Sequence, residues 1–220
     1  MEHSSKSHPG QAVYSPLVLR IYDWWVLSVS NRWIWKCPTA EILSWFNQHA
    51  STNHLDVGVG TGYYPDHATF PRSDIRLGLM YLNTNCLQYA TTRLKRFQPE
   101  QFRNDILAPI PQQIAKFDSI SLNYVLHCLP EPLTQKACVL DHLLPLLKEG
   151  GCLFGSTILG PTESTSKLAR LLMKKYNQRG IFGNDQDSIE ELQNALSNRF
   201  STFDIKQVGQ IALFVGWYNL

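Results

Sequence analysis

The chain has 220 residues, which suffices for one domain of ordinary size with a buried core. Its apolar fraction of 44% and charged fraction of 17% are typical of globular proteins and exclude a chain that is disordered throughout. A net charge of +2, without a dense run of lysine and arginine, gives no reason to expect a nucleic-acid partner.

The five cysteines are widely spaced, odd in number and free of any C-x-x-C pair, so neither a disulfide framework nor a metal site is expected. Reduced thiols fit a cytoplasmic location better. No apolar run reaches the roughly 18 residues that a membrane-spanning helix needs, so no span is expected. The first residues lack the basic and apolar segments of a secretion signal.

Residues 1–12 are expected to form a flexible leader. A helix is predicted to begin at Ser15, because serine can cap a helix and Pro16 suits its first turn. The stretch from there to Trp35 is apolar nearly all round. Such a helix must be covered by protein or must itself cover another part of the molecule.

The rest of the chain alternates between strand and helix patterns. A second helix is predicted over 37–49, with Thr39 as its cap. A further helix over 132–151 is predicted to end at a glycine pair. The other predicted helices cover 83–97, 165–180 and 188–200, and the predicted strands cover 54–59, 74–80, 117–125, 152–159 and two runs within 202–219.

Strands that alternate with helices predict an α/β domain with a mostly parallel sheet and helices on both faces. The last two runs are joined by Val208, Gly209 and Gln210, so they are predicted to pair as an antiparallel hairpin. No linker divides the chain, and we expect one domain over 13–220.

The stretch HLDVGVGTGYY, residues 54–64, follows the first strand with three glycines, Gly58, Gly60 and Gly62. Glycine permits positive φ and lets a ligand approach the backbone closely. In open α/β sheets, ligands bind at the carboxyl edge where strand order reverses. The alternative is a tight turn without a ligand.

The pattern acid-x-G-x-G-x-G, which begins at Asp56, resembles the first motif of class I S-adenosylmethionine-dependent methyltransferases. FRNDIL, FDSISLNYVLHCLP and LLPLLKEGGCLFGSTIL follow in the order of that family, so the resemblance covers residues 40–220. It implies a Rossmann-like sheet of seven strands, S-adenosyl-L-methionine as cofactor and S-adenosyl-L-homocysteine as product.

The resemblance also implies roles for single residues. Asp56 would help to hold the methionine ammonium group, and the glycines would pack against the methionyl and ribose parts. Asp105 would accept from the adenine amino group while Ile106 packs on the ring; the alternative for Asp105 is a helix or turn cap. The cofactor site is completed by Tyr81, Leu82, Asn83, Asn104, Asn123 and Tyr124.

Tyr81 departs from the family pattern, because an acid that grips both ribose hydroxyls usually ends the second strand. Replacing a charged acceptor by a phenol would cost roughly 1.5–3 kcal/mol of binding. Four explanations are open: the ring stacks near the adenosine, Asn83 binds the hydroxyls instead, the cofactor role has been lost, or Tyr81 is a substitution in an otherwise intact site.

His127 follows the fourth predicted strand and is the candidate general base, since the pKa of an imidazole lies near neutral pH. The alternative is a hydrogen-bonded structural imidazole near the pocket wall. Cys128 is expected to pack as a small apolar residue.

Residues 13–50 are expected to form a helical lid over the core of residues 51–220, as in small-molecule members of the family. Tyr14, Tyr22 and Trp25 would line the pocket, or they are simply core aromatics. The loop 176–185 is predicted to border the substrate opening, with Arg179 meeting an acidic substrate group or remaining solvated.

The expected function is methyl transfer to a small, lipophilic or secondary metabolite, because the motifs of the DNA adenine, glutamine and cytosine methylating enzymes are absent from the sequence. Two alternatives are a methyltransferase fold that now catalyses cyclisation or rearrangement, and a binding module without catalysis. The sequence does not address the oligomeric state.

Overall fold

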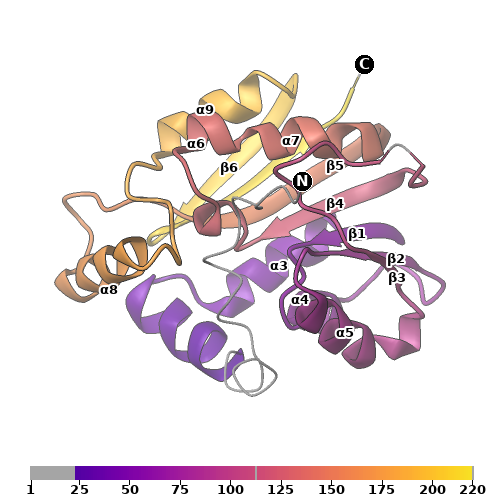
Figure 1. Cartoon of the computed structure of the whole chain (residues 1–220), viewed down its shortest axis with the longest axis horizontal. Helices are drawn as coiled ribbons and strands as arrows, with labels where there is room; N and C mark the ends of the chain where they lie inside the picture. Colours follow the sequence, from indigo (N-terminus) through magenta and orange to yellow (C-terminus); the bar gives the residue numbers. More distant parts are fainter. Residues whose placement is uncertain (1–22, 112, 220) are drawn as a thin grey trace, which may run out of the picture.

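The protein is described by a computed structural model over residues 23–111 and 113–219. In this part of the chain, seven strands form one sheet in the order β3-β2-β1-β4-β5-β7-β6 (Figure 1). Neighbouring strands pair in parallel except β7, which is antiparallel to both β5 and β6. The strands are β1 (Asn53–Val57), β2 (Arg76–Met80), β3 (Glu100–Phe102), β4 (Phe117–Asn123), β5 (Leu147–Ile158), β6 (Thr202–Val208) and β7 (Ile211–Trp217). The predicted fold class is confirmed, including the terminal hairpin.

The helices follow local signals in the sequence. Asn83 caps α5 by accepting from the amide of Cys86, and Ser188 with Glu191 forms the capping box of α9. The longer elements are η1 (Asp23–Ile34), a wide π-helix, α3 (Thr39–His49), α5 (Thr84–Arg93), α8 (Lys167–Gln178) and α9 (Ile189–Ser197). The short ones are α4 (Tyr63–His67), η2 (Lys95–Phe97), η3 (Leu126–Cys128), α6 (Leu133–Lys136), α7 (Cys138–Leu143) and η4 (Leu144–Leu146).

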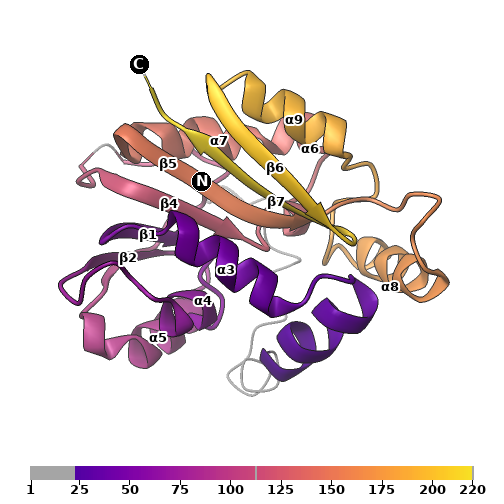
Figure 2. The ribbon, with the colours of Figure 1, turned by 180° about the vertical axis from the view of Figure 1, so that it is seen from behind.

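The helices cover both faces of the sheet (Figures 1 and 2). Helices α6, α7 and α9 lie on one face, where their leucines pack on the inner residues of β1, β4 and β5. Helices η1, α3 and α8 share the other face with Phe154 and the β7 residues Leu213 and Val215. Helix α5 packs on β2. Two covered faces suit the continuous apolar runs of the central strands.

Two predicted details are wrong. The helix predicted over 132–151 breaks into α6, α7 and η4 and ends at Leu146. Pro145, which has no backbone N–H, lies just after α7, and Gly150 lies in β5 with φ +75°. Pro38, not Thr39, precedes α3, and the hydroxyl of Thr39 donates instead to the carbonyl of Leu27. This hydrogen bond from Thr39 to Leu27 ties η1 to α3. The predicted leader, residues 1–12, lies outside the described residues.

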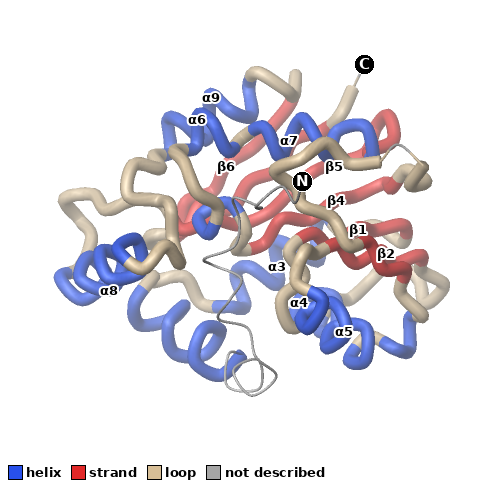
Figure 3. Tube along the Cα trace, in the orientation of Figure 1, coloured by secondary structure: helices blue, strands red, loops and turns tan. Residues whose placement is uncertain are grey.

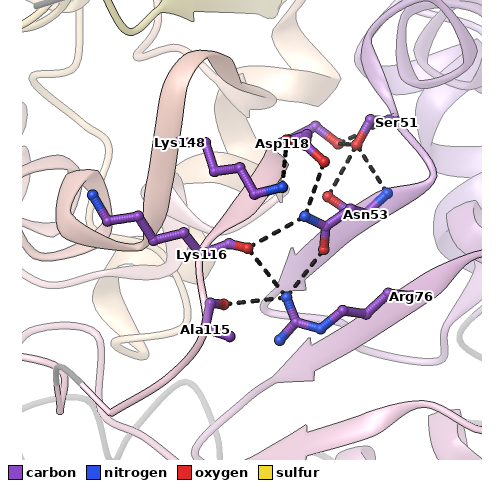
Figure 4. A network of polar contacts seen from close by, with 8 residues as sticks. Ser51, Asn53, Arg76, Ala115, Lys116, Asp118 and Lys148 are labelled. Carbon is purple, nitrogen blue, oxygen red and sulfur yellow. Dashed lines mark hydrogen bonds and ion pairs between the residues drawn. The ribbon is translucent and has the colours of Figure 1, made fainter.

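A polar network closes the amino-terminal edge of the sheet (Figure 4). The side-chain amide nitrogen of Asn53 donates to the carboxylate of Asp118 at 2.9 Å, and the side-chain oxygen of Asn53 accepts from Arg76 at 3.0 Å. Lys148 pairs with Asp118 at 3.0 Å. The network therefore joins β1, β2, β4 and β5 at the edge opposite to the one where the glycine turn lies.

An ion pair between Lys136 and Asp187 is fully buried. The ammonium group of Lys136 in α6 lies 2.6 Å from the carboxylate of Asp187, and neither side chain is exposed. Lys136 also donates to the carbonyl of Gly183 at 2.6 Å, and the amide of Gly183 donates to the carbonyl of His127 at 2.9 Å. The pair thus fastens the segment between α8 and α9 to the exit of β4.

We predict that Lys136→Met destabilises the protein by about 3–5 kcal/mol, because it leaves the carboxylate of Asp187 buried without its partner. Urea unfolding would measure the loss. Lys206→Met is the matched control, since Lys206 pairs with Glu41 at the surface and such pairs contribute less than about 1 kcal/mol. Equal losses in the two variants would contradict this view of the buried pair.

Candidate cofactor and substrate site

A cavity opens at the carboxyl edge of the sheet, where β1 and β4 are neighbours and strand order reverses. It measures about 990 Å³, including solvent space at its mouth. The loops that leave the strands, tan in Figure 3, supply most of its wall. The lining residues are Leu27, Asp56, Gly58, Val59, Gly60, Thr61, Tyr63, Tyr64, Met80, Tyr81, Leu82, Asn104, Asp105, Ile106, Asn123, Tyr124, Val125, Cys128 and Leu129.

The glycine turn has the backbone shape that its sequence predicts. Gly58 has φ +73°, and an added Cβ would lie 2.2 Å from Val125, so the turn packs directly against the exit of β4. Gly60 has φ +53°, and nothing lies closer to its missing Cβ than a backbone oxygen at 3.9 Å. The turn therefore presents bare backbone to the cavity at Gly60.

Asp56 lies at the bottom of this turn and is 3% exposed. Burial raises the pKa of its carboxyl group to about 7, while a hydrogen bond from the hydroxyl of Ser121, at 2.6 Å, opposes that rise. A cationic ligand group in the cavity would favour the ionised form. Asp56 is thus a carboxylate whose charge state near neutral pH depends on its neighbours.

Tyr81 and Leu82 line the cavity at the end of β2, where the resemblance places the ribose site. Asn83 does not line it, and its side-chain carbonyl accepts from the amide of Cys86 as the cap of α5. The side-chain oxygen of Asn83, which would have bound the ribose hydroxyls in place of the usual acid, is thus engaged in capping α5. Of these three residues, Tyr81 is the one with a hydroxyl at the cavity wall.

The loop after β3 brings Asn104, Asp105 and Ile106 to the wall. One carboxylate oxygen of Asp105 accepts from the amide of Leu107 at 3.1 Å, as in an Asx turn. The turn fixes the carboxylate beside the cavity. Asp105 therefore both caps a turn and lines the cavity.

Asn123 and Tyr124 end β4. Asn123 is 7% exposed; its side-chain carbonyl oxygen accepts from Ser156 at 3.0 Å, and its side-chain amide nitrogen finds no hydrogen-bond partner among the described residues. A buried donor without a partner at a cavity wall is available to a ligand acceptor. Tyr124 adopts a left-handed φ of +58°, and its hydroxyl donates to Asn31 of η1 at 2.8 Å. Such backbone conformations concentrate at functional sites.

His127 lies behind the wall rather than on it, since the lining does not include it. Its Nδ1 accepts from the amide of Ile158 at 3.3 Å, and its ring packs against Phe182 with the centroids 4.7 Å apart. Burial, and then the charge of Lys136, lower the pKa of His127 to about 3. These contacts favour the structural imidazole, and the general-base role stays a prediction.

Two further predicted residues, Arg179 and Gly62, are not brought to the cavity. Arg179 is exposed and does not line it, and Gly62 is the N-cap of α4. Tyr14, Tyr22 and the side chain of Trp25 lie outside the described residues. None of residues 176–185 lines the cavity; this segment contacts His127 behind the cavity wall.

The lining also contains residues that the sequence analysis missed. Tyr63 and Tyr64 directly follow the glycine motif, so their position was a usable signal. Cys128 and Leu129 follow β4 as His127 does. Burial raises the pKa of the Cys128 thiol to about 12, which keeps it protonated and unsuited to nucleophilic attack. Leu27 comes from η1, and no local pattern marks it.

The described lining residues include two carboxylates and four tyrosines, but no lysine, arginine or histidine. A wall of this kind attracts cations through charge and through aromatic faces, and it repels a pyrophosphate.

The part of the chain that the structure describes holds no group of three His, Cys, Asp or Glu side chains suited to a metal ion. Within the same residues, none of the helices combines the length and the apolar character needed to cross a membrane.

We predict that Asp56→Asn stabilises the protein more at about pH 8 than at about pH 5, by on the order of 1–3 kcal/mol. Because the folded pKa lies above the unfolded one, wild-type stability falls as pH rises from about 4 to about 7. Urea unfolding of both proteins at the two pH values would measure this. Asp118→Asn, at an exposed carboxylate, controls for the lost charge, and an identical gain there would refute the explanation.

No family model matches the chain. Curated relatives match over nearly its whole length. The Physcion biosynthesis cluster O-methyltransferase of Aspergillus chevalieri is 38% identical over 93% of this chain and 93% of its own. The demethylluteothin O-methyltransferase of Streptomyces thioluteus is 33% identical over 94% of this chain and 90% of its own.

Solved structures share the fold at low sequence identity. The CurJ carbon methyltransferase superposes with a TM-score of 0.67 and 15% identity, over 96% of this chain and 61% of its own. The N-methyltransferase NodS of Bradyrhizobium japonicum, in complex with S-adenosyl-L-homocysteine, superposes with a TM-score of 0.58 and 17% identity, over 82% and 84%. With relatives above 30% identity over nearly the full length, the chain belongs to the class I methyltransferases that act on small molecules.

Proposed function

We propose that this methyltransferase uses S-adenosyl-L-methionine to methylate a hydroxyl oxygen of a small lipophilic metabolite. The observation that carries the proposal is the cavity lining, where bare backbone at Gly60 lies beside two carboxylates and four tyrosines, without a basic side chain among the described residues. This lining suits a cationic adenosyl ligand. The names of the relatives support transfer to oxygen.

The residues present fit the cofactor. Asp56 would hold its ammonium group, and the unpartnered amide of Asn123 would donate to its carboxylate or to the substrate. Asp105 would accept from the adenine amino group, with Ile106 against the ring. When bound, the cofactor supplies a methyl group on a positively charged sulfur, which a nucleophilic oxygen can attack.

The chain's own part in the reaction is to position the substrate and to exclude water. Helix η1 contributes Leu27 to the wall and is tied to it by the hydrogen bond between Tyr124 and Asn31. Asn31 is fully buried and also donates to Thr39 at 2.9 Å, so η1 is held from two sides. We propose that η1 is the inner part of the lid expected over residues 13–50.

The described lining holds no imidazole that could take the proton of a substrate hydroxyl. An acidic hydroxyl, such as that of a phenol or an enol, needs little help to lose its proton. We therefore propose this substrate class. Neither phosphate nor sulfate esters suit a cavity lined by Asp56 and Asp105, because like charges repel.

Calorimetric titration with S-adenosyl-L-methionine tests the proposal. We expect binding in wild type and at least a tenfold loss in Asp105→Asn, which removes a charge-assisted hydrogen bond. Incubation with a set of phenols should then form S-adenosyl-L-homocysteine. Binding without any methylated product would favour the fold that has lost methyl transfer, and absence of binding would refute the proposal.

Tyr81→Asp is predicted to tighten cofactor binding by roughly tenfold to a hundredfold, because a carboxylate offers two charged acceptors to the ribose hydroxyls. Tyr81→Phe is the matched control; it keeps the ring and loses only the hydroxyl. Isothermal titration of both variants would measure the change. Weaker binding by Tyr81→Asp than by Tyr81→Phe would show that the aromatic ring itself binds the adenosine.

His127→Gln separates the two roles of His127. Because the imidazole lies behind the wall, we expect turnover within about tenfold of wild type and a pH profile of the same shape. Steady-state kinetics across the pH range would test this. A loss of 10²–10⁴ in turnover with unchanged cofactor affinity would instead establish the general base.

A further inference from the structure

Four polar side chains lie in a row beneath the cavity, on one face of the two central strands. His54 and Asp56 are two residues apart on β1, and Ser119 and Ser121 are two apart on β4, so each pair shares a face. The parallel register sets His54 beside Ser119 and Asp56 beside Ser121. All four are at most 3% exposed.

Hydrogen bonds join the row into a chain. The hydroxyl of Ser121 donates to Asp56 at 2.6 Å, and Nε2 of His54 lies 3.0 Å from the oxygen of Ser121. Nδ1 of His54 lies 2.8 Å from the hydroxyl of Ser119, which accepts from the amide of Ser51 at 2.8 Å. The chain thus runs from the cavity to the opposite edge of the sheet, where Ser51 belongs to the network of Figure 4.

Apolar rings insulate the middle of the chain from water. The imidazole of His54 lies edge-on to Phe46 of α3, at a centroid distance of 5.1 Å, and stacks on Phe154 of β5 at 5.7 Å. This burial lowers the pKa of His54 to about 3, so the ring stays neutral with one proton on one nitrogen. Its two serine partners therefore decide which nitrogen carries that proton.

The direction of the hydrogen bonds depends on the charge of Asp56. When Asp56 is ionised, Ser121 donates to it, Nε2–H of His54 donates to Ser121, and Ser119 donates to Nδ1. When Asp56 is protonated and donates to Ser121, each bond reverses and the proton of His54 lies on Nδ1. Each of the three shared protons moves one position toward Asp56, and the added proton restores the hydroxyl of Ser119, which then donates to the hydroxyl oxygen of Ser51 at 2.9 Å, so the exchange balances.

We propose that Ser119, His54 and Ser121 are a positioning chain that orients the ionised carboxylate of Asp56 toward the cavity and couples the tautomer of His54 to its charge. The inference rests on the proposed function, in which Asp56 binds the ammonium group of the ligand. A ligand with that group binds the ionised form, so it drives His54 to the Nε2–H tautomer.

The hydrogen bond from the hydroxyl of Ser121 stabilises the ionised carboxylate of Asp56. The other titratable groups at the cavity are Asp105 after β3, Cys128 after β4, and the tyrosines 63, 64, 81 and 124. None of the described lining residues is a lysine or an arginine, and no ion pair to Asp56 is found among the described residues. Loss of the Ser121 hydroxyl therefore shifts Asp56 toward its protonated form.

Binding of S-adenosyl-L-homocysteine, measured by calorimetry from about pH 6 to about pH 9, tests the positioning role. We expect Ser121→Ala to weaken binding about tenfold at neutral pH and to approach wild type at the alkaline end. Thr157→Val is the matched control, since it removes a buried hydroxyl that makes no hydrogen bond within the part of the chain that the structure describes. A loss that is constant across the pH range would overturn the proposal.

The tautomer of His54 tests the coupling without a ligand. In the ¹⁵N-histidine-labelled full chain, the ring nitrogens should report Nε2–H at high pH and Nδ1–H at low pH. His54→Gln assigns the signals. The change should vanish in Ser121→Ala and persist in Thr157→Val; an unchanged tautomer across the range would refute the coupling. Absence of ligand binding by wild type at every pH would refute the proposed function, while this second test still decides the coupling.

Discussion

Strand β1 pairs in parallel with β2 on one side and with β4 on the other, and the chain crosses to opposite sides of the sheet at this point. Loops that leave β1 and β4 therefore diverge and leave a hollow between them. Gly58 sits against Val125 in that hollow without room for a side chain. The cavity, its acidic wall and the buried polar row all depend on the pairing of β1 with β4.

The same pairing brings polar groups into a core that is otherwise apolar. Asp56, His54, Ser119 and Ser121 are buried between α3 and the sheet, where an unpaired polar group would cost roughly 1–3 kcal/mol. Their mutual hydrogen bonds offset part of this cost, although burial still leaves Asp56 with a raised pKa. The site thus retains a carboxylate that would be more stable in water, and such perturbed groups are concentrated at functional sites.

The buried ion pair of Lys136 and Asp187 has a different role. Lys136 and Asp187 neutralise one another within 2.6 Å, behind the cavity wall, and they fix the segment that carries Phe182 against His127. The two buried histidines also differ in their hydrogen-bond partners. His54 has hydroxyl partners that can donate or accept, whereas His127 has a backbone amide, which can only donate, and an aromatic ring.

The sequence by itself determined the fold class, the terminal hairpin and the position of the glycine turn, because strand and helix periods, caps and the glycine spacing are local signals. It also placed ten of the predicted residues at one sheet edge, since parallel strands end at a common edge: Asp56, Gly58, Gly60, Tyr81, Leu82, Asn104, Asp105, Ile106, Asn123 and Tyr124. The tertiary structure decided what local patterns cannot encode. It placed His127 behind the wall, brought Leu27 over the cavity and set His54 within hydrogen-bonding distance of Ser119 and Ser121, because each of these depends on contacts between segments far apart in the chain. It also showed that the side chain of Asn83 caps α5 instead of lining the cavity.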